Sequence, residues 1–396
     1  MPLFHQTAED TRHARPRALA AALANSAMQV PLHAELNLPL WELGHLGWFE
    51  EHWLARNPQR LSGPRAASTP RSPSLLARAD ALYDSSTVAH AARWQLSLPD
   101  AAAAKRYIAQ VRERSLALLG DVAGEAGSDA GGQAGDDELY FFRLVLLHED
   151  MHREAWAYMA QALDIPLPLH APASSALSGQ WQAAGGPFLL GHSGAGFAFD
   201  NELGAHEVTL APFSIDRAPL PWGPYLDFIR AGGYDDERLW SAAGWRWRQQ
   251  NQMSSPRYVQ RDGDHFTRRR FGRTEPVDVS QPAVHLSAHE AQAYCRWAGR
   301  RLPSEAEWEF AALRSAEQGE PFEWGAVWEW TASEFAPYPG FTAHAYRDYS
   351  APWFNSRPVL RGASFATSAR LRHPRYRNYF EAQRNDIFAG LRTCAL

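Results

Sequence analysis

The strongest chemical signal in the sequence is a pair of histidines four residues apart, His148 and His152, in the stretch HEDMH. Residues four apart project from one face of an α-helix, so both imidazoles can reach one cation. A third histidine, His45, lies among aromatic and aliphatic residues at helical spacing over residues 38–53. Three neutral imidazoles would hold a metal ion and leave coordination positions open, as a catalytic metal requires.

The histidines also fit two other interpretations. The pair matches the H-E-x-x-H pattern of zinc hydrolases, in which Glu149 would be the general base. Alternatively, the pair consists of partly buried polar residues in a helix, and His45 is a hydrogen-bonded core residue. The hydrolase interpretation is the weaker of the enzyme hypotheses, because His45 lies far upstream of the pair.

Two neighbours of His45 are interpreted separately. His52 lies one heptad later, two turns along the same helix, and we expect it to be structural. Gly44 removes a side chain beside His45, which would permit close helix packing or substrate approach; an ordinary tolerated glycine is the alternative.

Helices must position these histidines, and the apolar pattern predicts four. Apolar residues recur at helical spacing over residues 7–28, 36–55, 100–120 and 138–163. Residues 121–137 are rich in Gly, Ala and Asp without periodicity, which predicts a mobile surface loop. Four such helices predict a bundle, whose ligand sites lie between facing helices.

The sequence changes character after residue 165. A Pro- and Ser-rich linker is followed by short apolar runs separated by Gly, Pro and Trp. The pattern predicts short strands over residues 185–192, 206–216 and 357–365, and short helices over residues 288–297 and 304–313. The fold class is therefore expected to be α+β, a helical bundle followed by a loop-rich domain.

The composition limits the function classes. A chain of 396 residues predicts two or three domains. A net charge of −5 and the lack of a run of roughly 18 apolar residues argue against nucleic-acid and membrane partners. Two cysteines, Cys295 and Cys394, are too few for a disulfide framework, and the first residues lack the apolar region of a secretion signal. We therefore expect a cytoplasmic enzyme.

The order of several fragments resembles the iron-dependent sulfoxide synthases of ergothioneine biosynthesis. The first half carries LWELGHLGWFEEHWL, ALYDSSTVAHAARWQLSLP and LLHEDMHREAWAYMAQAL, and the second half carries GGPFLLG, FDNELGAHEVTLAPFSID, VWEWTASEF and RHPRYRNYFEAQRNDIFAGLR. The resemblance covers nearly the whole chain. It implies a DinB-like four-helix bundle over residues 1–168 with the metal ligands, followed by a domain like the formylglycine-generating enzyme (C-type-lectin-like) over residues 169–396 that lines the substrate pocket.

The resemblance also implies roles for individual residues. His45, His148 and His152 would hold Fe(II). Tyr346 matches the tyrosine that donates a proton or hydrogen atom during oxygen chemistry, and Tyr349 is the alternative for this role.

The same resemblance implies a site for hercynine, which is trimethylhistidine. Asn378 matches a residue that contacts the trimethylammonium end of this substrate. Tyr379 and Trp353 would add cation–π attraction for the quaternary ammonium, although most aromatic residues of this type are core residues.

Departures from the family pattern concern the second substrate. In members that use gamma-glutamylcysteine, an acid and an arginine hold the thiol donor; Arg384 fits the arginine, but Phe380 stands where the acid is expected. Met151 stands where a Gln is usual. Arg93 matches a second donor-binding arginine, with a surface or linker cation as the alternative.

These departures favour the selenoneine synthase branch, which joins hercynine to a selenosugar with O2. An ergothioneine-type synthase that uses gamma-glutamylcysteine or cysteine is the alternative. A non-catalytic binding module is a further alternative. A formylglycine-generating activity is disfavoured, because Cys295 and Cys394 lie outside the segments where its cysteine pair is expected.

Overall fold

The computed structural model describes residues 28–67, 70–128, 135–170, 172–193 and 196–396 and divides into two compact units. The first unit contains the described residues up to Trp156, the segment ending at Phe197, and Ala343–Asp348. The second contains Ala157–Ser193, Ala198–Thr342 and Tyr349–Leu396. A short piece of the C-terminal half is therefore part of the N-terminal unit.

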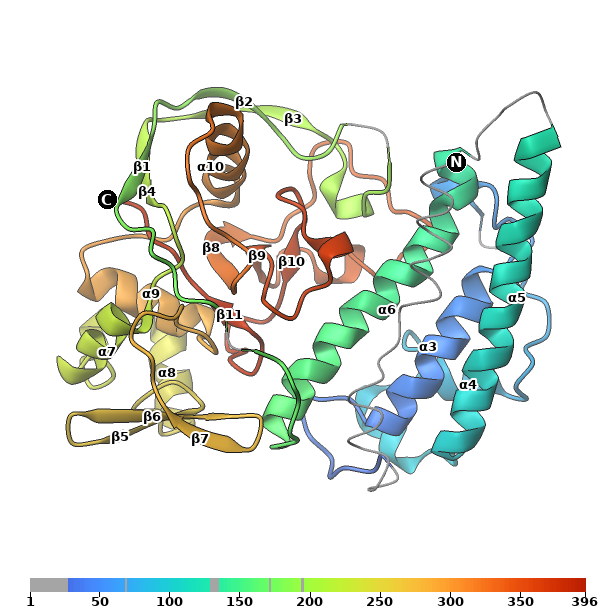
Figure 1. Ribbon diagram of the computed structural model, residues 1–396, viewed down its shortest axis with the longest axis horizontal. Helices are drawn as coiled ribbons and strands as arrows, with labels where there is room; N and C mark the ends of the chain where they lie inside the picture. Colours follow the sequence, from blue (N-terminus) through green and yellow to red (C-terminus); the bar gives the residue numbers. More distant parts are fainter. Residues whose placement is uncertain (1–27, 68–69, 129–134, 171, 194–195) are drawn as a thin grey trace. The chain divides into compact units, whose positions relative to one another are not determined.

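The first unit is helical (Figure 1). Its described helices are α3 (Pro39–Trp53), the short α4 (Ala79–Tyr83), α5 (Ala101–Ser128) and α6 (Asp136–Ala162), which crosses into the second unit at its C-terminal end. Nearly every residue of α3 is buried. A helix that is buried on nearly all sides is a core element, so α3 is a core helix of this unit.

The three long helices confirm the predictions over residues 36–55, 100–120 and 138–163. The predicted helix over residues 7–28 lies outside the described residues, apart from Met28. The loop prediction for residues 121–137 is wrong in its first part, because α5 continues to Ser128. Val122 is buried, and the Ala and Glu residues that follow have high helix propensity, so the two glycines there do not end the helix.

Gly44 allows α3 to pack closely against α4. A Cβ atom at this position would lie 2.1 Å from Cζ of Tyr83, whose ring is completely buried. The sequence suggests that Gly44 permits either close helix packing or substrate approach, and the structure shows close helix packing.

We expect Gly44→Ala to lower the free energy of unfolding by about 1–3 kcal/mol, since overpacking outweighs the roughly 1 kcal/mol that alanine gains in helix propensity. Urea unfolding followed by circular dichroism measures the difference. Gly120→Ala on α5 is the matched control, because no atom lies within 4 Å of its added Cβ, and it should gain stability. Equal stabilities of the Gly44→Ala and wild-type proteins would contradict the prediction.

The described part of the second unit contains four small sheets. The pairs β1 (Gln180–Ala183) with β4 (Phe213–Asp216) and β2 (Gly186–Leu190) with β3 (His206–Leu210) are antiparallel. A meander is formed by β5 (Val259–Asp262), β6 (His265–Arg270) and β7 (Arg273–Pro276). The four-stranded sheet has the order β10-β9-β8-β11, from Asn378–Tyr379, Pro358–Gly362, Trp328–Glu334 and Ala389–Gly390.

Four helices accompany these sheets in the second unit: α7 (Trp222–Arg230), α8 (Ala242–Gln250), α9 (Ala288–Trp297) and α10 (Glu305–Gln318) (Figure 1). Both α9 and α10 start at a serine that forms a capping box with a glutamate three residues later. The helix prediction for residues 288–297 is confirmed. The prediction for residues 304–313 is short at its C-terminal end, because the helix ends only at Gly319 in the left-handed conformation.

The strand predictions are confirmed for β2 and β9. The single strand predicted over residues 206–216 is instead two strands, β3 and β4, in different sheets. Pro212 lies between them and lacks the N–H group that a continuous ladder would need.

Buried arginines organise the loops of this unit. Arg361 donates to Glu309 on α10 at 2.9 Å, and Arg377 donates to both carboxylate oxygens of Glu305 at 2.9 and 3.0 Å. Arg377 also donates to the carbonyl of Asn201 at 2.8 Å. A guanidinium carries five donors, so it can satisfy loop carbonyls and helix carboxylates together in a domain with little regular structure. Among the described residues, no helix has the length and apolar character needed to cross a bilayer.

Candidate three-histidine metal centre

Three histidines from two helices converge in the first unit. His45 lies on α3, and His148 and His152 lie on successive turns of α6. The Nε2 atom of His148 lies 3.4 Å from Nε2 of His45 and 3.2 Å from Nε2 of His152. These three form the one group of potential metal-ligating side chains found among the described residues. The structure thus brings together the three residues that the sequence singles out.

The opposite ring nitrogens of two histidines are fixed by hydrogen bonds. His45 Nδ1 donates to the carbonyl of Tyr83 at 2.8 Å, and His152 Nδ1 donates to the carboxylate of Glu42 on α3. A metal-ligating histidine typically donates its second N–H to such an acceptor, which fixes the tautomer and the ring orientation. With Nδ1 protonated, the Nε2 lone pairs of both rings remain available to a cation.

The arrangement fits a metal ion on chemical grounds. The three histidines offer ligand atoms that lie within 4.8 Å of one another, as ligands around a shared cation would. Burial lowers the pKa of His45 and of His148 well below the usual value, so both are neutral and able to ligate. His148 stacks on Phe49 with ring centroids 3.5 Å apart, and His45 stacks on Trp41 at 4.8 Å. Aromatic walls therefore hold the imidazole planes.

The two candidate tyrosines have different surroundings. Tyr346 belongs to the first unit, and its ring centroid lies 5.0 Å from that of Phe49 and 6.3 Å from that of His148. Burial raises the pKa of Tyr346, which keeps its hydroxyl protonated at neutral pH. Tyr349 belongs to the second unit, where its ring stacks on Phe199 and its hydroxyl hydrogen-bonds to the hydroxyl of Tyr376 at 3.1 Å.

Glu149, the candidate general base of the hydrolase interpretation, is bound by an arginine. Arg112 on α5 donates to its carboxylate at 2.5 Å and also binds Glu50 of α3. Burial raises the pKa of Glu149 to about 7, although the Arg112 guanidinium opposes this shift. The hydrogen-bond partner of the Glu149 carboxylate is therefore Arg112 of α5 and not one of the three histidines.

We expect Glu149→Gln to lower turnover by less than ~10-fold, because the amide oxygen can still accept the hydrogen bond from Arg112, whereas loss of a general base costs ~10²–10⁴-fold. Steady-state kinetics together with metal content tests this. A near-total loss of turnover with the metal still bound would favour the hydrolase mechanism instead.

Three further residues near the histidines have defined environments. Arg93 is buried: its guanidinium carbon lies 3.8 Å from the ring centre of Trp41, and it donates to Asn37 at 2.5 Å. The alternative of a surface cation is therefore wrong for Arg93. Met151 lies on α6 between the two histidines and is half-buried. His52 accepts a hydrogen bond from Arg71 at 3.2 Å, as a structural residue would.

The second unit holds the residues expected to contact hercynine. In β10, Asn378 accepts a hydrogen bond from the Tyr379 backbone at 2.9 Å through its side-chain oxygen. The Tyr379 ring stacks on Phe335 with centroids 3.9 Å apart. Trp353 is already covered by the guanidinium of Arg357 at 4.0 Å, so the structure does not support this ring as an open ammonium site.

The surroundings of Arg384 correct one expectation. The sequence predicts an apolar neighbourhood for it, with Phe380 in place of an acid. Phe380 does lie beside it, with the guanidinium carbon 5.1 Å from the ring centre. However, Asp386 binds Arg384 through both oxygens at 2.6 and 2.7 Å. The backbone turns between Arg384 and Asp386, which brings the carboxylate of Asp386 into contact with the Arg384 guanidinium.

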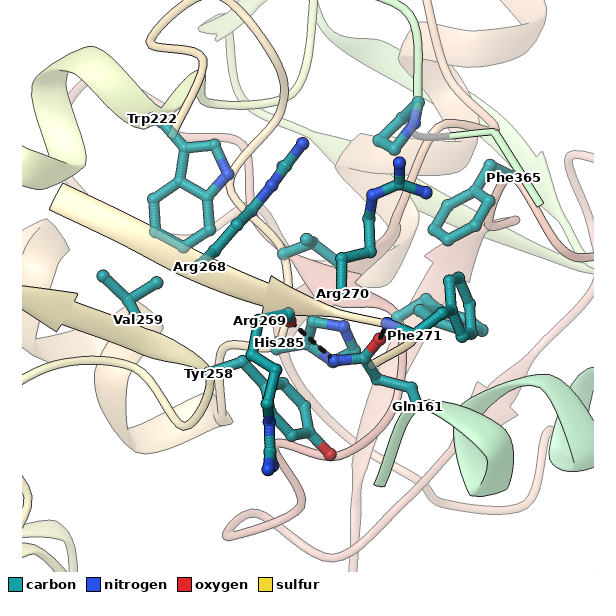
Figure 2. A pocket seen from close by; sticks show the side chains of 13 residues that line it. Gln161, Trp222, Tyr258, Val259, Arg268, Arg269, Arg270, Phe271, His285 and Phe365 are labelled. Carbon is teal, nitrogen blue, oxygen red and sulfur yellow. Dashed lines mark hydrogen bonds between the residues drawn. The ribbon is translucent and has the colours of Figure 1, made fainter. Parts of the chain in front are cut away.

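A separate pocket in the second unit was not predicted from the sequence (Figure 2). Gln161, near the end of α6, donates to the carbonyl of Arg269 and accepts from the backbone N–H of Phe271, both at 2.8 Å. His285 lines the same pocket with φ 65°, and burial lowers its pKa to about 3. The side-chain amide of Gln161 hydrogen-bonds to the backbone of β6 and of the turn after it. These hydrogen bonds attach the end of α6 to this sheet.

Sequence reasoning missed the groups that orient the ligands. Glu42 precedes His45 by three residues on α3, and this spacing is a signal that could have identified it. The contact between His45 and the Tyr83 carbonyl cannot be predicted in this way, because every residue has a backbone carbonyl. Arg112 is one of several cations on an amphipathic helix, so its partners follow only from the packing.

Comparison with known proteins defines the class of protein first. Residues 8–155 match the DinB superfamily, and residues 170–327 match the sulfatase-modifying factor enzyme 1-like domain. The protein is thus an α+β protein with an N-terminal DinB-like helical bundle and a loop-rich domain like the formylglycine-generating enzyme.

Full-length relatives then define the family. The hercynine oxygenase of Mycolicibacterium smegmatis is 33% identical, and the match covers 97% of each chain. The hercynine oxygenase of Mycobacterium tuberculosis is 33% identical, with 89% of each chain covered. The formylglycine-generating enzyme of Streptomyces coelicolor is 34% identical but covers only 40% of this chain. The chain belongs to the hercynine oxygenase family.

The two cysteines do not suit the chemistry of the formylglycine-generating relative. Cys295 and Cys394 are buried and form no disulfide. Burial raises the pKa of each thiol to about 12, which disfavours the reactive thiolate.

Proposed function

We propose that this protein is a non-haem Fe(II), O2-dependent synthase that joins hercynine to a selenosugar through a C–Se bond, as in selenoneine biosynthesis. The observation that carries the proposal is the convergence of His45, His148 and His152, with Nδ1 partners in place for His45 and His152. Membership in the hercynine oxygenase family supports hercynine as one substrate. The atoms balance: the Se–H and ring C–H bonds break, C–Se and Se=O bonds form, and the second oxygen of O2 leaves as water.

The histidines would hold iron through their Nε2 atoms. Iron bound there would supply open coordination positions and electrons for oxygen chemistry. Tyr346 holds a proton on its hydroxyl, with its ring packed against Phe49 close to His148, and would deliver it to the reacting oxygen. Tyr349 is the alternative donor, but its hydroxyl already pairs with Tyr376.

Hercynine recognition is assigned to the second domain, which we take as residues 169–396 after a bundle of residues 1–168. Asn378 and Tyr379 on β10 are the proposed contacts for the trimethylammonium group. The face of an aromatic ring attracts a quaternary ammonium by about 0.5–2 kcal/mol. Two reduced cysteines agree with action in the cytoplasm, where thiols stay reduced.

The donor proposal depends on charge. Arg384 is paired with Asp386, so its charge is already balanced, and the apolar ring of Phe380 lies beside it. Such surroundings suit a sugar better than the charged ends of gamma-glutamylcysteine. The alternative is an ergothioneine-type sulfoxide synthase using gamma-glutamylcysteine or cysteine, and the full-length relatives are compatible with it.

The test is competition between donors. With hercynine, O2 and equal concentrations of a 1-seleno sugar and gamma-glutamylcysteine, we expect kcat/KM to favour the seleno sugar by ~10²-fold or more, since an unpaired buried ammonium costs several kcal/mol. Product masses identify the bond formed. A preference for the thiol peptide would assign the protein to the alternative function and leave the iron site unaffected.

A further inference from the structure

Arg112 links the two helices that carry the histidines. Its Nε atom donates to both oxygens of Glu50 on α3 at 2.9 and 3.0 Å. Its Nη2 atom lies 2.8 Å from Glu50 Oε2 and donates to Glu149 Oε2 on α6 at 2.5 Å. One guanidinium on α5 therefore binds a carboxylate from α3 and a carboxylate from α6 at the same time.

Both carboxylates lie close to ligands along their helices. Glu149 is adjacent to His148 on α6, and Glu50 follows His45 by five residues on α3. The helices run antiparallel, since Trp53 stacks on Phe141 while Glu42 hydrogen-bonds to His152. Two polar connections therefore link α3 to α6, Glu42–His152 and Glu50–Arg112–Glu149, and along α3 they lie on either side of His45.

Apolar packing alone does not define the axial position of α3. This helix is buried on almost all sides, mostly by aromatic and aliphatic packing, and the hydrophobic effect has no direction. A shift by one residue moves a helix by about 1.5 Å, whereas metal–ligand distances tolerate only about 0.2 Å. A guanidinium fork between two carboxylates is directional, and buried ion pairs are best attested as devices that fix register.

The surroundings of Arg112 strengthen these interactions. Leu54, Leu119, Phe142 and Leu146 surround the three charged groups. The side chains of Glu50, Arg112 and Glu149 are 6%, 20% and 12% exposed. Charges interact more strongly in such an environment than in water, and an unpaired carboxylate there is costly.

We propose that Arg112 is a positioning residue that sets the register of α3 against α6 so that the three imidazoles meet at one metal ion. This proposal rests on the metal site of the proposed function but on neither substrate. It also gives the glutamate of the HEDMH motif a role, as the α6 end of this connection.

The test measures Co(II) binding to the metal-free protein by absorption spectroscopy. We expect Arg112→Met to raise the Kd by ~10–100-fold, the range for groups that orient ligands, and to change the ligand-field bands of the bound cobalt. Arg112→Lys keeps the charge without the fork and should raise the Kd by about threefold to tenfold. Circular dichroism and thermal unfolding of the metal-free proteins report on the fold.

Arg143→Met is the matched control. Arg143 is 13% exposed and binds Asp136 at 2.7 Å, but both residues lie on α6, so this pair joins no two helices. This variant should keep the wild-type Co(II) affinity and spectrum.

Wild-type affinity and bands in folded Arg112→Met would overturn the proposal. If that variant does not fold, wild-type behaviour of Arg112→Lys would overturn it equally. An equal loss of affinity in Arg143→Met would also overturn it, because the effect would then follow from the loss of any buried arginine. Failure of the wild-type protein to bind Co(II) would instead refute the metal site itself.

Discussion

Replacing His45 by alanine is expected to abolish metal binding and turnover while the protein stays folded. The side chain supplies one of three converging Nε2 atoms, and its loss leaves only the two histidines of α6. The loss in metal affinity should exceed the ~10–100-fold typical of groups that merely orient ligands. Metal analysis of protein purified under anaerobic conditions, together with oxygen consumption, measures both effects.

The matched control is His52→Ala, on the same helix and one heptad later. His52 accepts a hydrogen bond from Arg71, and burial lowers its pKa to about 4, so it is neutral and structural. This variant should keep its iron. Full iron occupancy in the His45→Ala protein would refute the assignment of His45 as a ligand, and loss of iron in both variants would show that the effect is general.

Replacing Tyr346 by phenylalanine is expected to lower turnover by ~10²–10⁴-fold, the usual contribution of a positioned proton donor, without changing iron affinity. Phenylalanine retains the edge contacts that the ring makes with Phe49 and Trp53, so packing is preserved. Because burial raises the pKa of Tyr346 above its ordinary value, its proton is retained through the neutral range. The wild-type rate should therefore show no loss from its ionisation between about pH 6 and 9.

Tyr349→Phe is the comparison. It removes the hydrogen bond to Tyr376 and should cost about 0.5–1.5 kcal/mol of stability with little loss of turnover. Single-turnover kinetics of both variants with hercynine and the preferred donor would separate them. A larger loss of turnover in Tyr349→Phe than in Tyr346→Phe would show that Tyr349, and not Tyr346, is the proton donor.

Much of the fold is predictable because its signals are local. The spacing of His148 and His152 places them on one helical face whatever surrounds the helix. The capping boxes at Ser287 and Ser304 define two helix starts within four residues each. Where local signals mislead, as in the stretch before Ser128, burial of Val122 and high helix propensity outweigh the glycines.

The resemblance supplied candidates for the site that local spacing could not. It identified Tyr346, but only the structure shows that its segment belongs to the first unit, beside Phe49 and His148. It also left Arg384 without an acid, whereas the backbone turn brings Asp386 onto it. Such contacts depend on how a loop folds back, which periodicity does not encode.

By itself, the sequence determined the three long described helices of the first unit, the pair of histidines and the two-part α+β organisation, because each follows from residues close together in the chain. Only the tertiary structure decided how these parts form a site. Glu42 meets His152, and Tyr83 meets His45, across helices that are distant in sequence. Such pairings exist only once apolar burial has brought the helices together, since the free energy of one hydrogen bond is too small to order the chain between its partners.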